Sequence, residues 1–154
     1  MRLGDLLKAE CVELDAPAVT KEELIRGLVD RLAEQGLVRT APPVVRALLD
    51  REEVMSTGVG GGVALPHAQS SAVAEFAVAI ARPREPIDFD ALDGRPVEVV
   101  FLVVGPEDRT GLMRVLTRVS RLLYTGDLQK KIRKAKSAPE VVRLAVAEEA
   151  RLRP

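Results

Sequence analysis

The stretch "PVEVVFLVVGP", residues 96–106, decides the fold class. Its apolar run from Val97 to Val104 is nearly continuous, which is typical of a central strand buried on both faces rather than of an alternating, half-exposed strand. Two further strands are predicted at 63–68 and 75–83, ahead of this run. The middle of the chain is therefore expected to form the sheet.

Helical spacing of apolar residues predicts helices on both sides of these strands. Thr20 and Ser137 stand in N-cap positions, each with a glutamate three residues later in capping-box position, and Gly36 can end the first helix. Helices at both ends and strands between them predict one α/β domain over 1–154, with a mixed central sheet flanked by helices. The segments with helical spacing are 20–36, 42–55, 110–126, 127–137 and 137–153.

Composition excludes several classes of function. Among the 154 residues the formal net charge is zero and aromatic residues are 3%, so neither a basic surface nor a stacking platform for nucleic acid is predicted. The single cysteine, Cys11, rules out an internal disulfide and a cysteine metal site, and its strand-like surroundings predict a small buried hydrophobe. No apolar run approaches about 18 residues and no signal core is present, so a cytoplasmic protein without metal or cofactor is expected.

The segment "GVGGGVALPHA", residues 58–68, holds four glycines and the only histidine, His67. A dinucleotide fingerprint requires a third glycine where Val63 stands and a helix after it, and a Walker loop requires a Gly-Lys-Ser/Thr sequence that is absent. Nucleotide binding therefore fails on spacing and context. The glycines instead predict a tight turn into a strand, which clears space around His67 and offers backbone N–H groups.

The longer stretch "REEVMSTGVGGGVALPHA", residues 51–68, resembles the active-site signature of the enzyme IIA domains of the phosphoenolpyruvate-dependent phosphotransferase system. The resemblance is to the fructose/mannitol class, which includes the nitrogen-regulatory proteins. It extends more loosely to the first helix, the central strand with its following loop, and "LTRVSRLL" in the next helix. The positions that match the signature are Glu52, Val59, Gly60, Val63, Ala64, Leu65, Pro66, His67 and Ala68.

The resemblance implies a phosphotransferase with a phosphohistidine intermediate. His67 takes the phosphoacceptor position, which in the family receives a phosphoryl group from a histidine-containing phosphocarrier protein and can pass it to a cysteine of an enzyme IIB domain. Arg51 matches the arginine that would neutralise the phosphoryl oxygens. A regulated kinase or transporter is the partner implied for nitrogen-regulatory members, and contact with a membrane is implied only through partners.

The residues themselves suit this chemistry. Phosphoryl transfer needs positioning and charge stabilisation more than covalent chemistry from the protein. The neutral imidazole of His67 is a competent nucleophile near pH 7, and the guanidinium of Arg51 matches phosphate geometry. The further candidates for phosphoryl contacts are the hydroxyls of Ser56 and Thr57 and the loop residues Gly58 and Gly60.

Each candidate has a plain alternative. Arg51 is also what an ordinary surface arginine at a helix end looks like. Ser56 and Thr57 can serve only to cap or to turn the chain. Glu52 can simply pair with Arg51 or face solvent.

One departure from the family pattern concerns a second histidine. Many members carry one near the site in the helix after the central strand, and here the position falls at Leu112 or next to it. This favours a nitrogen-regulatory phosphocarrier, as does the expectation of a free-standing domain with no fused IIB or membrane segment. The alternatives that remain open are a sugar-transport IIA component that passes phosphate to an enzyme IIB cysteine, and a regulatory binding protein with little transfer activity.

Overall fold

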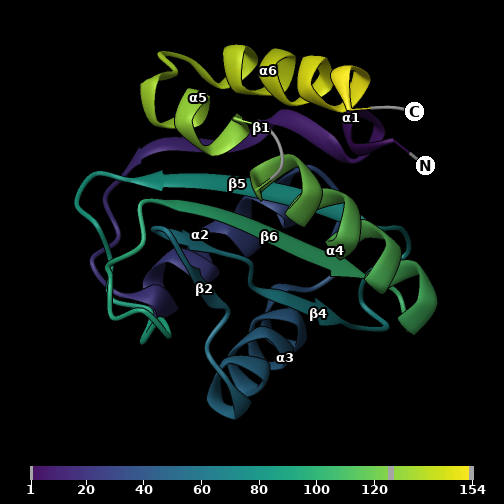
Figure 1. The fold of residues 1–154 in the computed structure, drawn as a ribbon. Helices are drawn as coiled ribbons and strands as arrows, with labels where there is room; N and C mark the ends of the chain where they lie inside the picture. Colours follow the sequence, from purple (N-terminus) through teal and green to yellow (C-terminus); the bar gives the residue numbers. More distant parts are fainter. Residues whose placement is uncertain (1, 125–126, 153–154) are drawn as a thin grey trace.

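The computed structural model describes residues 2–124 and 127–152 as an α/β domain with a mixed sheet (Figure 1). Strand order is β1-β5-β6-β3-β2, and β4 also pairs with β6. The β1–β5, β3–β6 and β4–β6 pairs are parallel, whereas β5–β6 and β2–β3 are antiparallel. The described strands are β1 (Leu7–Ala16), β2 (Gly58–Gly60), β3 (Val63–Ala64), β4 (His67–Gln69), β5 (Ala77–Pro83) and β6 (Val99–Gly105).

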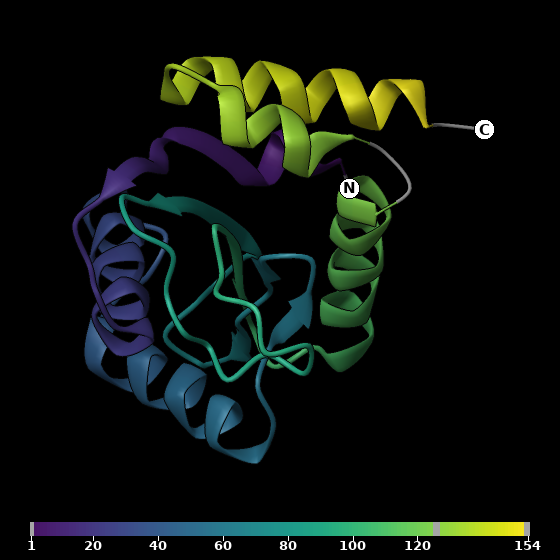
Figure 2. The same ribbon diagram turned by 60° about the vertical axis from the view of Figure 1, so that its left-hand side comes forward.

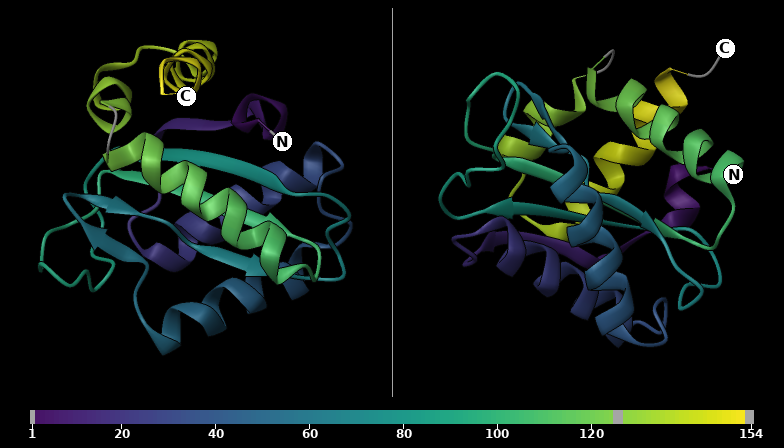
Figure 3. Two further views of the ribbon diagram at one scale, coloured as in Figure 1. Left: turned by 45° about the vertical axis from the view of Figure 1, so that its right-hand side comes forward. Right: turned by 90° about the horizontal axis from the view of Figure 1, so that it is seen from below.

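Helices cover both faces of this sheet (Figures 1 and 2). One face packs against α2 (Lys21–Glu34) and α3 (Ala41–Val54). The other face packs against the C-terminal helices and a short N-terminal one, and the two views of Figure 3 show α4 lying across it. The helices of this second layer are α1 (Leu3–Leu6), α4 (Arg109–Tyr124), α5 (Leu128–Lys134) and α6 (Ala138–Arg151).

The central strand β6 confirms the prediction made from its apolar run. All seven of its residues are buried. Because side chains alternate along a strand, Val99, Phe101 and Val103 join the apolar cluster under α4, whereas Val100, Leu102 and Val104 join the cluster under α2 and α3. A strand placed between two helical layers needs apolar residues on both faces, which is why the run is continuous.

The helix caps also agree with the sequence. Thr20 Oγ1 accepts a hydrogen bond from Glu23 N at 3.2 Å, and Ser137 Oγ accepts one from Glu140 N at 3.2 Å. Each cap satisfies one of the backbone N–H groups that a helix start leaves without an intrahelical partner. Among the described residues, no helix combines the length and the apolarity needed to cross a membrane.

Two strand predictions need correction. The sheet includes a strand at the N-terminal end, β1, which the reading of helices at both ends left out; Cys11 lies in it and is fully buried, as expected. The strand predicted at 63–68 is divided into β3 and β4, although both keep the same register against β6. The division falls at Pro66, because proline has no N–H to donate to a neighbouring strand.

Candidate functional site

His67 is the first residue of β4, at the end of the sheet where the central strand finishes. It pairs with Val103 in β6, and Val103 N donates to Pro66 O at 2.9 Å. The next residue, Ala68, is buried in the cluster under α2 and α3, so the alternation along β4 turns the half-buried His67 side chain to the opposite face. β4 therefore presents the imidazole on the α4 side of the sheet.

The imidazole is anchored through one of its two nitrogens. His67 Nδ1 lies 2.8 Å from Leu65 O. A carbonyl oxygen can only accept, so Nδ1 must carry the proton in this contact. In the neutral ring the lone pair then resides on Nε2, which is the nucleophilic atom.

The Leu65 carbonyl is available to the ring because of its direction. The carbonyls of Gly62 and Pro66 accept from β6 N–H groups, so the peptide groups of Leu65 face the other way, towards β2. Leu65 N donates to Thr57 O at 3.0 Å. Thr57 lies opposite Leu65, but its own N–H donates to Glu52, so the Leu65 carbonyl accepts from the imidazole instead.

The surroundings lower the pKa of His67 below its ordinary value of 6.5. Burial is the main cause, because it disfavours the charged imidazolium, and the nearby Arg51 guanidinium acts in the same direction. The hydrogen bond to Leu65 and the charge of Glu52 oppose the shift. The imidazole is therefore neutral at pH 7, the state in which Nε2 can attack.

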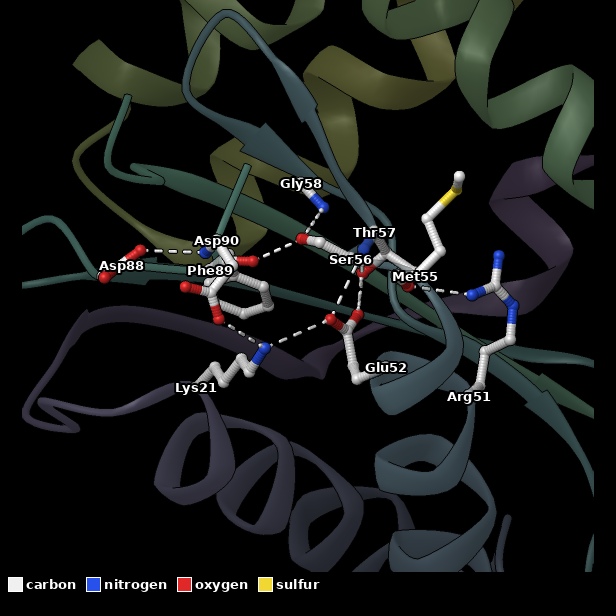
Figure 4. Close-up of polar contacts among 10 residues, drawn as sticks. All are labelled: Lys21, Arg51, Glu52, Met55, Ser56, Thr57, Gly58, Asp88, Phe89 and Asp90. Carbon is white, nitrogen blue, oxygen red and sulfur yellow. Dashed lines mark hydrogen bonds and ion pairs between the residues drawn. The ribbon is translucent and has the colours of Figure 1, made fainter. Parts of the chain in front are cut away.

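Arg51 lies in the last turn of α3 and is close enough to His67 to act on its charge. Its Nη1 donates to Met55 O at 2.9 Å (Figure 4). The side chains of Val54 and Met55 beside it are exposed, at 82% and 56%. Arg51 thus lies within electrostatic reach of His67, and its contact with Met55 engages Nη1.

Glu52 does neither of the two things expected of it, since it neither pairs with Arg51 nor faces solvent. It is only 5% exposed and accepts hydrogen bonds from Thr57 N, at 3.2 Å, and from Thr57 Oγ1. Lys21 Nζ lies 3.7 Å from its other oxygen (Figure 4). A buried carboxylate needs such partners to offset its lost hydration. Sequence reasoning missed this role, and its one signal was that Glu52 opens the signature.

The hydroxyls of Ser56 and Thr57 are engaged within the protein. Ser56 Oγ donates to Phe89 O and accepts from Gly58 N at 3.0 Å, and the Thr57 hydroxyl donates to Glu52 (Figure 4). Thr57 is 3% exposed. Of the two readings left open by the sequence, this geometry favours capping and turning of the loop over contact with a phosphoryl group.

The glycines do not surround His67. Gly60, Gly61 and Gly62 all have positive φ, of 99°, 69° and 79°, and form the turn between β2 and β3. Gly62 lies beside Val99 of β6, whereas His67 lies beside Val103, so about 13 Å of strand separates them at about 3.3 Å per residue. The turn is a structural hairpin, and the structure does not bring Gly60 to the histidine.

The turn has partners of its own. Gly61 N donates to Asp93 Oδ2 at 3.0 Å, and Gly61 O accepts from Arg133 Nη2 of α5 at 2.6 Å. At Gly58 an added Cβ would lie 2.9 Å from the Cβ of Ala91, so close approach explains this glycine. The glycine-rich segment thus serves the hairpin and its contacts with neighbouring loops and α5.

The position aligned with a second histidine, Leu112, is 8% exposed on α4. It belongs to the same apolar cluster as Leu65 and Val103, which flank the His67 backbone. An apolar side chain thus occupies this place, and the polar partners of the candidate site come from the 51–57 segment. Among the described residues, no group of three or more histidine, cysteine or acidic side chains is arranged to hold a metal ion.

Comparison with known proteins shows which family this chain belongs to. The fructose-specific EIIA component of the phosphotransferase system of Haloferax volcanii is 38% identical over 143 residues, 90% of this chain and 91% of that protein. The crystal structure of nitrogen regulatory protein IIA-Ntr from Neisseria meningitidis superimposes with a TM-score of 0.81 at 32% identity, over 92% of this chain and 97% of that one.

A third similar structure is the Escherichia coli mannitol enzyme IIA in its complex with phosphorylated mannitol enzyme IIB. It superimposes with a TM-score of 0.78 at 26% identity, over 92% of this chain and 97% of that chain. The model of the family described as "phosphoenolpyruvate-dependent sugar phosphotransferase system, EIIA 2" matches residues 5–146. The chain therefore belongs to the EIIA 2 family of the phosphoenolpyruvate-dependent sugar phosphotransferase system, whose domains transfer phosphoryl groups through phosphohistidine.

Proposed function

We propose that this protein is a phosphocarrier that accepts a phosphoryl group on Nε2 of His67 from a histidine-containing phosphocarrier protein, in the cytoplasm. The observation that carries the proposal is the 2.8 Å contact between His67 Nδ1 and Leu65 O. It leaves Nε2 with the lone pair of a neutral ring, on the half-buried face of β4 and within the electrostatic reach of Arg51.

The transfer step follows from this arrangement. Nε2 of His67 forms a bond to phosphorus while the bond between phosphorus and the donor's histidine nitrogen breaks, so the donor ring leaves with its electron pair. The proton on Nδ1 stays in place, hydrogen-bonded to Leu65 O, so the ring becomes a phosphorylated imidazolium whose positive charge offsets that of the phosphoryl oxygens. Arg51 supplies positive charge beside the three phosphoryl oxygens, whose negative charge dominates the energetics of the step.

The partner that receives the phosphoryl group defines two branches of this proposal. The nitrogen-regulatory branch is favoured by the absence of a second histidine, with Leu112 at its place, and by the similarity to IIA-Ntr. In this branch the phosphorylation state of His67 controls a kinase or transporter. The sugar-transport branch is favoured by the 38% identity to a fructose-specific EIIA component and by the structural likeness to the mannitol IIA that binds phosphorylated IIB.

A labelling experiment tests the acceptor site. Incubation with phosphoenolpyruvate, enzyme I and a histidine-containing phosphocarrier protein is expected to give acid-labile, base-stable phosphate on this protein. The label should be absent from His67→Ala, whose circular dichroism and melting curve show whether the fold is kept. Label that persists on a folded His67→Ala variant would overturn the site.

A second part of the experiment measures the contribution of Arg51 to phosphoryl uptake and identifies the protein that receives the phosphoryl group. Arg51→Ala should slow phosphoryl uptake on the order of 10- to 100-fold without unfolding the domain, because the side chain serves charge stabilisation and is not part of the core. Unchanged uptake would show that Arg51 is only a surface residue. Adding a fructose-type or mannitol-type IIB domain to the labelled protein then separates the branches, since only the sugar-transport branch predicts rapid loss of label to the IIB cysteine.

A further inference from the structure

The buried carboxylate of Glu52 is connected by hydrogen bonds to the loop that contacts Arg51 and, through Leu65, His67. We propose that Glu52 is a positioning residue for phosphoryl transfer, because it fixes the loop at 55–57. That loop in turn holds the guanidinium of Arg51 and the imidazole of His67. The inference rests on the phosphoacceptor role proposed above, and it adds a residue that touches neither phosphate nor donor.

The first step is the attachment of the loop to Glu52. The side chain of Glu52 is 2% exposed, and it accepts from both the backbone N–H and the hydroxyl of Thr57. Lys21, from the start of α2, lies 3.7 Å from the carboxylate (Figure 4). Because both hydrogen bonds to this desolvated carboxylate come from Thr57, moving Thr57 would leave buried acceptor oxygens without hydrogen-bond donors, which is costly. Thr57 is thereby fixed to the end of α3.

A second set of bonds attaches the same loop to the connection between β5 and β6. Ser56 Oγ donates to Phe89 O and accepts from Gly58 N (Figure 4). The loop is thus fixed at consecutive residues, by Glu52 at Thr57 and by Phe89 at Ser56. A connection held on both sides has few conformations available to it, so groups bonded to its backbone are held too.

One branch leads from the loop to Arg51. Arg51 Nη1 donates to Met55 O at 2.9 Å, and Met55 directly precedes the two anchored residues. Arginine has a long, flexible side chain, and a carbonyl acceptor fixed in space restricts the positions of its guanidinium. If Glu52 released Thr57, the Met55 carbonyl would lose its support and Arg51 its orientation.

The other branch leads to His67. Thr57 O accepts from Leu65 N at 3.0 Å, and Leu65 O accepts from His67 Nδ1 at 2.8 Å. The carboxylate of Glu52 therefore connects to the imidazole through two residues, Thr57 just before β2 and Leu65 just after β3. This chain of bonds holds the ring in the tautomer whose Nε2 is free to attack.

The inference requires residue 52 to be a hydrogen-bond acceptor, so a conservative substitution that keeps an acceptor can test it. The side-chain oxygen of glutamine can accept from both Thr57 donors, whereas leucine of similar size can accept from neither. Lys21 keeps a second carboxylate, Asp90, at 3.3 Å when Glu52 is neutral. Glu52→Gln should therefore largely preserve the site, and Glu52→Leu should not.

The experiment compares Glu52→Leu, Glu52→Gln and the control Glu53→Leu, which alters the exposed neighbouring glutamate. Nitrogen-15 NMR of the single histidine reports the proton on Nδ1 or Nε2 in the unphosphorylated protein, and phosphoryl uptake is measured on the same samples. Glu52→Leu is expected to raise the Nε2–H tautomer and to slow uptake about tenfold or more, as loss of a hydrogen-bonded support of this kind implies. Glu52→Gln and Glu53→Leu should stay within about threefold of the parent protein.

The outcomes separate this inference from the proposed function. The tautomer measurement needs no phosphoryl donor, so it tests the Glu52 chain of bonds even if the parent protein takes up no label. A folded Glu52→Leu variant with the parent's tautomer and uptake rate would overturn the inference, as would a folded Glu52→Gln variant as slow as Glu52→Leu. If Glu52→Leu does not fold, Thr57→Val removes one of the two bonds with less disruption, and it should move both readouts in the same direction.

Discussion

The glycine turn between β2 and β3 offers a test that separates backbone conformation from packing. Gly36, Gly61 and Gly62 have similar positive φ values of 74°, 69° and 79°, so alanine at any of them meets the same left-handed penalty of about 1 kcal/mol. The space around them differs. An added Cβ meets nothing within 4 Å at Gly36 and one atom at 4.0 Å at Gly61, but it lies 2.9 Å from Arg133 Nη2 at Gly62.

Arg133 cannot move aside without loss, because its guanidinium is held by other groups. Displacing it weakens partly exposed contacts that together contribute about 1 kcal/mol. We therefore expect the free energy of unfolding to fall by about 1 kcal/mol in Gly36→Ala and Gly61→Ala, and by about 2 kcal/mol in Gly62→Ala. The groups that accept hydrogen bonds from the Arg133 guanidinium are Gly61 O at 2.6 Å, Glu98 Oε2 at 2.7 Å and Gln129 Oε1 at 3.1 Å.

Urea denaturation of the three variants measures these differences, and each kcal/mol should also lower the melting temperature by about 2–4 °C. Phosphoryl uptake by the folded variants should equal that of the parent protein, because the turn lies far along β6 from His67. Equal destabilisation by Gly61→Ala and Gly62→Ala would refute the packing argument. A folded Gly62→Ala variant that loses phosphoryl uptake would refute the assignment of the turn to structure alone.

Two further predictions concern titration. The pKa of His67, followed by NMR, should lie below 6.5 and should rise in Arg51→Ala, because the lost cation disfavoured the imidazolium. Since the unfolded state binds this proton more readily than the folded state, the free energy of unfolding should decline as the pH falls through 6.5. This decline should be smaller in His67→Gln. Hydrogen bonds from Arg151 and Lys131 lower the pKa of Glu148 to about 2 and outweigh the opposing effect of burial, so the stability that this carboxylate contributes is full above pH 4.5 and lost towards pH 2. Glu148→Gln should flatten that acid limb in urea denaturation.

The parts of the fold that the sequence predicts are those in which one pattern dominates. The apolar run of β6 needs two covering layers, and the capping boxes at Thr20 and Ser137 have no competing use. β1 is harder, because its ten residues mix buried and exposed positions without strict alternation and contain register shifts against β5. Such a strand can be recognised only from its pairing with β5, which lies far along the chain and is not visible in the local sequence.

The candidate site divides in the same way. His67 belongs to a long signature with fixed spacing and Arg51 directly precedes it, so the family resemblance alone predicts that they act together. The burial of Glu52 is not visible there, because an acid beside an arginine at a helix end looks like a solvent-exposed pair. Nor does a cluster of glycines reveal whether it clears room for a phosphate or for the guanidinium of Arg133. Both questions depend on contacts with segments remote in sequence, Lys21 for the first and α5 for the second.

The contact between His67 Nδ1 and the Leu65 carbonyl has a consequence for aggregation. A carbonyl at an unpaired sheet edge invites a strand from another molecule, and proteins protect such edges in various ways. Here the group that covers the carbonyl is the imidazole of His67, the proposed phosphoacceptor. Under the proposed function, phosphorylation on Nε2 would leave the Nδ1 proton where it is and the edge covered, whereas modification of Nδ1 would uncover it. We therefore expect transfer through Nε2 to leave this edge protected whether or not His67 is phosphorylated.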